Sequence, residues 1–245
     1  MSLLIYQLAA DQVVVLNDTL SATDDGVPYG FGPKTEVLPH SDVVLTMLGS
    51  HRLHRRWAHR VIDGTLHDSI DDLVPVMAEL LASATTEDER DVESVAYAFG
   101  WSPAEERMVG FAFPSAGFAP ERLPDGLSIH PPILDGDGSA IEDDAGRGGW
   151  RRFACTETGE PILDEDGAPV ETREPPAHLS DLMSLAVARQ ELVDQDFAEG
   201  RTTVRIGGHL LMTVLERGVI VCRRLCELAD YREHRAAADL ANRLR

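Results

Sequence analysis

The chain has 245 residues, 43% of them hydrophobic, which is enough to bury the core of one domain or at most two. Asp and Glu number 42 against 22 Lys and Arg, so the formal net charge is -20. A surface this negative repels phosphate backbones and anionic lipid, and we expect neither nucleic acid nor a membrane as a partner. The first residues lack a basic segment followed by a long apolar run, so we expect no signal peptide, no membrane helix and a cytoplasmic location.

The first 48 residues are typical of strands separated by turns. An apolar extended segment from Leu3 to Leu8 is followed by a short connection and a β-branched run from Val13 to Leu16, which predicts an antiparallel hairpin. Folding this hairpin around residues 10 and 11 places Asp18 beside Ser2 at its open end. The segments that follow are a turn-rich loop and two further strands, at residues 21–33, 36–38 and 42–48.

Helical periodicity begins at Ser50, which can cap a helix over residues 50–62. The predicted apolar face of this helix consists of Leu53, Trp57, Val61 and Ile62. The helix also carries four arginines and three histidines, which are His51, His54 and His59. We expect these histidines to be solvated on the helix surface rather than to bind a metal.

The rest of the chain predicts further helices and strands. Apolar residues at helical spacing predict helices at 69–84, 180–199 and 229–245, and extended segments predict strands at 95–101, 107–113, 203–214 and 219–222. Residues 114–178 contain nine of the fourteen prolines, and we expect them to form a loop-rich insertion on the surface. The order of elements predicts a single domain over residues 1–245 of the α+β class, with helices covering packed antiparallel sheets.

Three cysteines, at positions 155, 222 and 226, are too few for a disulfide framework and lack the paired spacing of a zinc site. We expect Cys222 and Cys226 to be small core residues. The sequence therefore predicts no metal and no disulfide.

Lysine is almost absent from the chain. Of the 22 basic residues 21 are arginine, and Lys34 is the only lysine. Codon bias would replace lysine by arginine at every position where any cation is sufficient. A single retained lysine therefore indicates a position that arginine cannot fill. An amine can shift its pKa in a protein, whereas guanidinium stays protonated. Lys34 is therefore a candidate functional residue, and the alternative is a chance survivor.

Lys34 is also one of three evenly spaced residues, because Asp18 follows Ser2 by 16 positions and Lys34 follows Asp18 by 16 more. A strand runs from the serine, a second strand ends at the aspartate, and Gly49 opens a helix. This pattern resembles the proteasome β-type subunits of the N-terminal nucleophile hydrolases. It is similar in particular to bacterial members such as HslV and Anbu, in which the nucleophile directly follows the initiator methionine.

The resemblance implies a four-layer αββα sandwich and an amide or peptide hydrolase that acts through an acyl-enzyme. Ser2 would be the nucleophile once Met1 is removed, and its own α-amine, with a pKa of about 8, would be the base. Lys34 would lower the pKa values of that amine and hydroxyl, and Asp18 would orient Lys34. The backbone N–H of Gly49, at the start of a helix, would stabilise the oxyanion.

The resemblance further implies that no cofactor is needed and that the protein self-associates into a homo-oligomer. Two predicted helices with several arginines, at 50–62 and 229–245, offer contact surfaces for acidic faces of a neighbouring copy. The expected partners are therefore other copies of the chain and a peptide or amide substrate.

The second half of the chain departs from the family pattern. The family has a Ser-Gly-Ser turn before its third helix and an acid near a Ser-Gly-Gly after it. This chain has residues 175–179 at the first place and Ile206-Gly207-Gly208 at the second, and Asp194 or Asp196 could supply the acid. Two alternatives remain open. The first is a protein of the same fold that lacks activity and serves as a structural or assembly subunit, and the second is an unrelated α+β binding protein.

Overall fold

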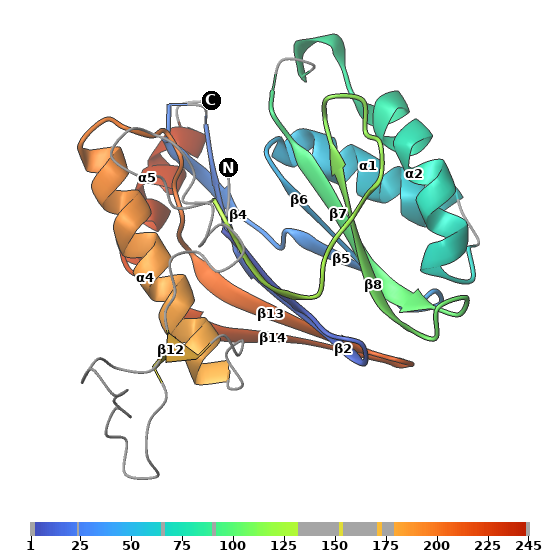
Figure 1. Ribbon diagram of the computed structural model, residues 1–245. Coiled ribbons are helices and arrows are strands. Elements are labelled where there is room, and N and C mark those ends of the chain that lie inside the picture. The colour runs from blue at the N-terminus through green and yellow to red at the C-terminus, as the bar shows by residue number, and fades with distance from the viewer. Residues whose placement is uncertain are drawn as a thin grey trace.

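The computed structural model describes residues 3–23, 25–64, 67–89, 92–131, 152–153, 171–172 and 179–243 (Figure 1). Its strands are β1 (Leu4–Leu8), β2 (Gln12–Asp18), β3 (Leu20–Ala22), β4 (Pro28–Phe31), β5 (Thr35–Leu38), β6 (Val43–Leu48), β7 (Val95–Ser102), β8 (Arg107–Pro114), β9 (Glu121–Arg122), β10 (Gly126–His130), β11 (Arg152–Phe153), β12 (Glu171–Thr172), β13 (His209–Glu216) and β14 (Val219–Glu227). Its helices are α1 (His51–Gly64), α2 (Ile70–Ala84), the short 3-10 helix η1 (Glu87–Glu89), α4 (Leu179–Ala198) and α5 (Tyr231–Arg243).

The strands form two five-stranded antiparallel sheets. One has the strand order β10-β1-β2-β13-β14 and the other the order β5-β6-β7-β8-β9. Shorter pairs, β3 with β4 and β11 with β12, lie outside these sheets. The mixed class of helices and antiparallel sheets that the sequence predicts is confirmed.

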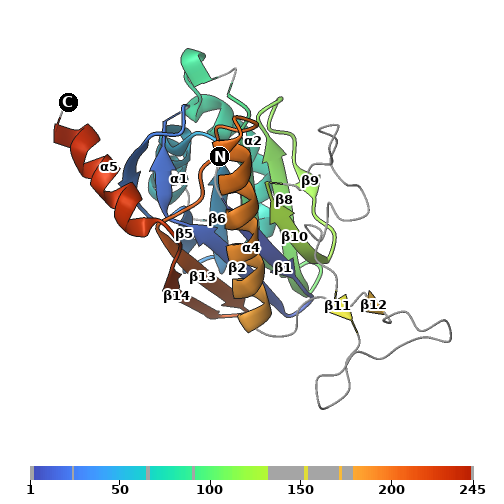
Figure 2. The ribbon, with the colours of Figure 1, turned by 90° about the vertical axis from the view of Figure 1, so that its left-hand side faces the viewer.

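Three clusters of buried side chains hold the helices and sheets together. The first joins α1 and α2 to the β5–β9 sheet and includes Trp57, Met77 and Phe113. The second joins α4 to the other sheet through residues such as Leu185. The third lies between the two sheets and includes Phe99. Figure 1 accordingly shows α1 and α2 on one side of the paired sheets and α4 and α5 on the other, and Figure 2 looks onto α4 where it crosses the strands.

The N-terminal hairpin has the predicted register. Leu4 lies opposite Asn17 in the β1–β2 pair, so the next step brings Leu3 to Asp18 at the open end. Strand β13 lies on the other side of β2, with Leu210 opposite Asp18. The residues that precede β13 therefore also pass the end of β2, which is where the candidate site lies.

Several elements differ from the prediction. The loop expected at 21–33 contains most of the β3–β4 hairpin, and β13 begins at His209 rather than at residue 203. The predicted insertion at 114–178 is not only loop, because β10 pairs along the whole of β1 and extends a main sheet. Most of the remainder of that predicted insertion, residues 132–151, 154–170 and 173–178, lies outside the described residues.

Three side chains also lie in environments other than those expected. His54, predicted to be solvated, is 2% exposed, because it lies beside Leu53 and Trp57 on the buried side of α1. Ile62, predicted on the apolar face, is 47% exposed. Cys222, predicted in the core, is exposed on β14, the outermost strand of its sheet. No helix among the described residues is long and apolar enough to span a membrane.

Candidate functional site

Asp18 and Lys34 form a buried ion pair at the end of β2. Lys34 Nζ lies 2.6 Å from Asp18 Oδ1, and the two side chains are 5% and 0% exposed. Two of the three evenly spaced residues, Asp18 and Lys34, are thus in direct contact. Burial lowers the pKa of Lys34, and the neighbouring carboxylate of Asp18 opposes that effect.

The Asp18 carboxylate is surrounded by donors on both oxygens. Oδ1 accepts from Lys34 Nζ and, at 2.9 Å, from the backbone N–H of Leu3. Oδ2 accepts from the backbone N–H of Leu20 at 3.3 Å and from that of Gly207 at 3.1 Å. One cation and three N–H groups therefore compensate the buried charge, as a buried carboxylate requires.

Leu3 is held through both of its backbone polar groups. Its N–H donates to Asp18, and its carbonyl accepts from Asn17 Nδ2 at 3.1 Å. Asn17 is itself fixed because its Oδ1 accepts from Thr35 Oγ1 at 2.6 Å. The chain that continues from Ser2 is thus clamped at its first described residue, whereas Met1 and Ser2 lie outside the described residues.

The backbone of Lys34 is tied to the second sheet. Its carbonyl accepts a hydrogen bond from Thr46 Oγ1 at 2.7 Å, and β5 begins at the next residue, Thr35, opposite Thr46. This contact fixes where the lysine side chain leaves the backbone. The pair with Asp18 therefore links the sheet of β2 to the sheet of β5 and β6.

Gly49 connects β6 to α1. Its φ of +103° is in the region that favours glycine, and a Cβ there would lie 2.6 Å from the carbonyl oxygen of Glu93. Ser50 follows as the predicted cap of α1, because its Oγ accepts from the N–H of Leu53 at 3.1 Å. The N–H of Ser50 in turn donates to Ser94 Oγ at 3.1 Å. Gly49 is therefore needed as glycine, and its part in binding an oxyanion stays a prediction.

The charge of Lys34 acts on two histidines in the first turn of α1. Burial, followed by the positive charge of Lys34, lowers the pKa of His51. The pKa of the deeply buried His54 is lowered to about 4, again first by burial and then by the charges of His51 and Lys34. Both histidines are therefore neutral near pH 7, and the sequence did not predict that they lie close to the candidate site.

Gly207 and Asn17 are further site residues that were not predicted. The N–H of Gly207 donates to Asp18, and its carbonyl accepts from the N–H groups of Thr19 and Leu20 at 3.2 and 3.1 Å. The only signal in the sequence was the glycine pair at 207 and 208. It falls where the family pattern has a Ser-Gly-Gly, but it could not show a contact with Asp18.

The two acids considered for the support of a nucleophile have other partners. Asp194 Oδ1 lies 3.7 Å from Arg205 Nε, and Asp196 Oδ1 lies 2.6 Å from an Arg201 nitrogen. Among the described residues, neither acid forms an ion pair with Lys34. Ser2 lies outside the described residues, so support of its amine by Asp194 or Asp196 stays a prediction.

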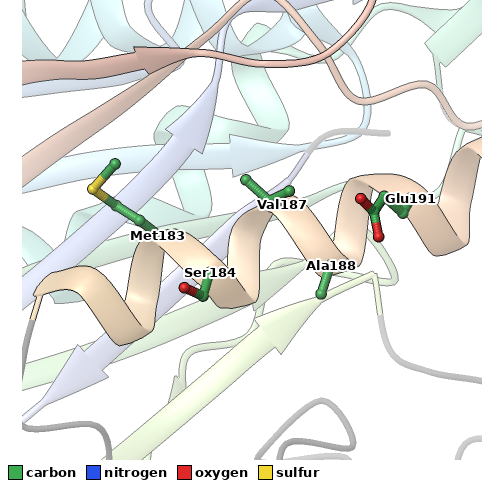
Figure 3. A pocket seen from close by; sticks show the side chains of 5 residues that line it. All are labelled: Met183, Ser184, Val187, Ala188 and Glu191. Atoms are coloured by element: carbon green, nitrogen blue, oxygen red, sulfur yellow. The ribbon is translucent and has the colours of Figure 1, made fainter.

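A surface hollow of about 530 Å³ lies elsewhere, on the exposed face of α4 (Figure 3). It is lined by Met183, Ser184, Val187, Ala188 and Glu191. Among the described residues, none of the predicted site residues lines it, and Glu191 is the one charged group in its lining. Over the described ranges, no cluster of three or more His, Cys, Asp or Glu side chains could hold a metal ion.

Comparison with known proteins relates the chain to others through its fold. No protein-family model matches it, and none of the curated proteins matches its sequence. Among solved structures, a mutant of Anbu from Hyphomicrobium sp. strain MC1 superposes with a TM-score of 0.59 at 12% identity and covers 100% of this chain and 94% of the other. Anbu from Yersinia bercovieri, described as an ancestral beta-subunit, gives a TM-score of 0.55 at 11% identity and covers 98% and 93%. The resemblance to this group is confirmed at the level of the fold.

Proposed function

We propose that the chain is an N-terminal nucleophile hydrolase with a four-layer αββα sandwich, which cleaves amide or peptide bonds through an acyl-enzyme on Ser2. Two separate observations support the proposal. The fold is similar to that of Anbu over nearly the whole of both chains. Asp18 contacts both Lys34 and Leu3, the residue after Ser2, and these contacts support the activity more directly than the fold does.

The observation that carries the proposal is that Leu3 and Lys34 share one oxygen of Asp18. The N–H of Leu3 and the amine of Lys34 both contact Asp18 Oδ1, at 2.9 and 2.6 Å. Leu3 is bonded to Ser2, so the backbone that carries the proposed nucleophile is anchored at the atom that binds the only lysine. A buried amine beside an N-terminal residue is the arrangement that an α-amine base requires.

In the proposed reaction, Ser2 Oγ attacks the substrate carbonyl while the α-amine of Ser2 accepts the hydroxyl proton. The tetrahedral oxyanion accepts a hydrogen bond from the N–H of Gly49. When the C–N bond breaks, the leaving amine takes the proton from the α-ammonium and an ester remains on Ser2. Water then attacks the ester, with the same α-amine as base, and releases the acid and the free hydroxyl.

Lys34 and Asp18 prepare this chemistry without taking part in bond breaking. A positive charge near the α-amine lowers the pKa of that amine and keeps more of it in the neutral form at pH 7. Asp18 holds the lysine in place and compensates its charge, which is buried with it.

Intact mass and covalent labelling test the proposal. The purified, untagged protein should weigh one methionine residue less than the encoded chain and should gain one acyl group from an electrophilic ester or β-lactone probe. Ser2→Ala is the matched control, because alanine also permits methionine removal but has no hydroxyl. Labelling of Ser2→Ala to the same extent, or activity in a chain that retains Met1, would refute Ser2 as the nucleophile.

One observation favours the second candidate function, a catalytically inactive structural or assembly subunit. Ile206 is fully buried and precedes the glycine pair, where the family pattern has serine. An inactive subunit would retain the Asp18–Lys34 pair only because loss of one partner would leave the other charge buried and alone. It would give no acyl adduct under any condition, and Ser2→Ala would leave its assembly unchanged.

A further inference from the structure

The C-terminal helix α5 lies against the segment that binds Asp18. His234, on this helix, is 3% exposed, and its ring lies over Gly207. A Cβ on Gly207 would lie 2.5 Å from His234 Nδ1, closer than side-chain atoms approach in folded proteins. The absence of a side chain at Gly207 therefore allows His234 to contact the backbone there.

A second contact fixes the orientation of the His234 ring. A guanidinium nitrogen of Arg205 forms a short hydrogen bond with His234 Nε2. Guanidinium only donates, so Nε2 is the acceptor and the neutral ring carries its proton on Nδ1. Burial and then the charge of Arg205 lower the pKa of His234, which keeps the ring neutral.

Arg205 is itself held by α4. Its guanidinium lies 4.2 Å over the ring of Phe197, and its Nε lies 3.7 Å from Asp194 Oδ1. The His234 ring is thus fixed by a group that is anchored on another helix and that lies only two residues before Gly207. The residue pair Arg205 and His234 holds the 205–207 segment between α4 and α5.

We propose that His234 is a positioning residue for Asp18 and acts through the Gly207 peptide. Gly207 donates to Asp18 Oδ2 through its backbone N–H and accepts from the N–H groups of Thr19 and Leu20 through its carbonyl. A displacement of Gly207 would alter three hydrogen bonds around the carboxylate that holds Lys34. The effect on turnover rests on the proposed function, whereas the effect on the Asp18–Lys34 pair does not.

Lys34 provides a direct readout because it is the only lysine in the chain. Protein labelled with ¹³C,¹⁵N-lysine gives a single Cε and Nζ signal, whose chemical shift and titration midpoint report the environment of the pair. In His234→Leu, which keeps apolar bulk but lacks an acceptor for Arg205, we expect this signal and its midpoint to move. In His234→Gln, whose carboxamide oxygen replaces Nε2, we expect both to return toward the wild-type values.

Arg235→Ala is the matched control. Arg235 follows His234 on α5 and its side chain is 57% exposed, so its replacement should leave the Lys34 signal unchanged. A wild-type Lys34 signal and midpoint in folded His234→Leu would overturn the proposal. Equal perturbation by His234→Leu and Arg235→Ala would also overturn it, because the effect would then come from general loosening of α5.

A double-mutant cycle covers the case in which His234→Leu fails to fold. Gly207→Ala places a methyl group against His234, and we expect it to shift the Lys34 signal in the wild-type background. In the His234→Ala background the two closest contacts of the methyl group are removed and only Leu20 Cδ2, at 3.1 Å, remains close, so the added shift from Gly207→Ala should be much smaller. Additive shifts would show that the contact between His234 and Gly207 does not control the pair.

Turnover separates this inference from the proposed function. If the chain is a hydrolase, His234→Leu should lower kcat by about 10-fold to 100-fold with little change in KM, because a misplaced group affects the chemical step. An unchanged kcat in an active enzyme would overturn the positioning role. If the wild-type protein shows no hydrolysis, the proposed function fails while the Lys34 signal still decides the positioning inference.

Discussion

Lys34 Nζ lies 2.6 Å from Asp18 Oδ1, and solvent reaches 5% of one side chain and none of the other. The attraction between two such charges is offset by the loss of their hydration, so a buried pair contributes little net stability. Removing one partner is different, because it leaves the other charge buried and alone. The only lysine of the chain thus occupies a position where substitution has consequences for both stability and chemistry.

Lys34→Met should destabilise the protein by about 3–5 kcal/mol, the usual effect of breaking a buried ion pair. Asp18 would keep its three backbone donors but lose its cation. Denaturant unfolding monitored by circular dichroism measures the change. Arg122→Met is the control, because its ion pair with Glu105 is exposed and should contribute about 1 kcal/mol or less.

Lys34→Arg examines chemistry rather than charge. The guanidinium preserves a cation beside Asp18 but lacks the compact amine, so turnover should fall by orders of magnitude if the proposed mechanism holds. The rate of hydrolysis of an amide substrate is the measurement. Wild-type turnover in this variant would show that the single lysine is an accident of composition.

Acid should destabilise the protein through His54. Its pKa in the folded state is about 4, against 6.5 for the free side chain, so the folded state favours the neutral ring. The stability contributed by the neutral His54 ring is fully present above about pH 6.5. It is lost as the pH falls toward 4, because the unfolded chain binds the proton first. Between pH 7 and pH 5 this one group should remove about 2 kcal/mol from the free energy of unfolding.

His54→Leu should reduce the loss of stability between pH 7 and pH 5 by a similar amount, measured by denaturant unfolding at both values. His59→Leu, at an exposed position on the same helix, is the control. If both variants lose the same stability as the wild type on acidification, protonation of His54 does not contribute to acid unfolding.

The parts of the fold that the sequence could predict are those governed by local pattern. An apolar extended segment, a short connection and a β-branched run are sufficient to predict the hairpin that brings Asp18 to Leu3. Strand β10 was missed because its five residues acquire their pairing from β1, far away in the sequence. Gly207 was missed for the same reason, since its bond to Asp18 spans 189 positions. The burial of His54 escaped prediction because residue type indicated a polar surface, although its place beside Trp57 is on the covered side of the helix.

Gly49→Ala tests the turn that opens α1. Alanine would be strained at φ +103°, and its Cβ would meet the backbone of Glu93 and Ser94 at 2.6 and 2.7 Å. We expect a loss of about 2 kcal/mol or more from strain and contact together. Gly30→Ala is the control, because no atom of the described residues, apart from the adjoining ones, lies within 4 Å of a Cβ there. Equal melting temperatures for the two variants would show that the turn at Gly49 adapts freely.

Self-association is expected to use the outer sides of α1 and α5. A net charge of -20 per chain opposes association, and the basic side chains of these helices offer places where acidic surface of another copy can pair. Within the chain, Arg56 already contacts Glu89 and Arg60 already contacts Ser83. On α1 we therefore expect mainly Arg52 and its neighbours to pair with another copy.

Each of these two helices also presents an exposed apolar side chain, since Ile62 on α1 is 47% exposed and Leu240 on α5 is 60% exposed. We expect a homo-oligomer of six or more copies by light scattering near physiological salt. Ile62→Asp and Leu240→Asp should each reduce its size, since they add negative charge to an apolar contact. The expected surfaces would be wrong if neither variant changed an oligomer of that size, and a monomer at every salt concentration would exclude self-association itself.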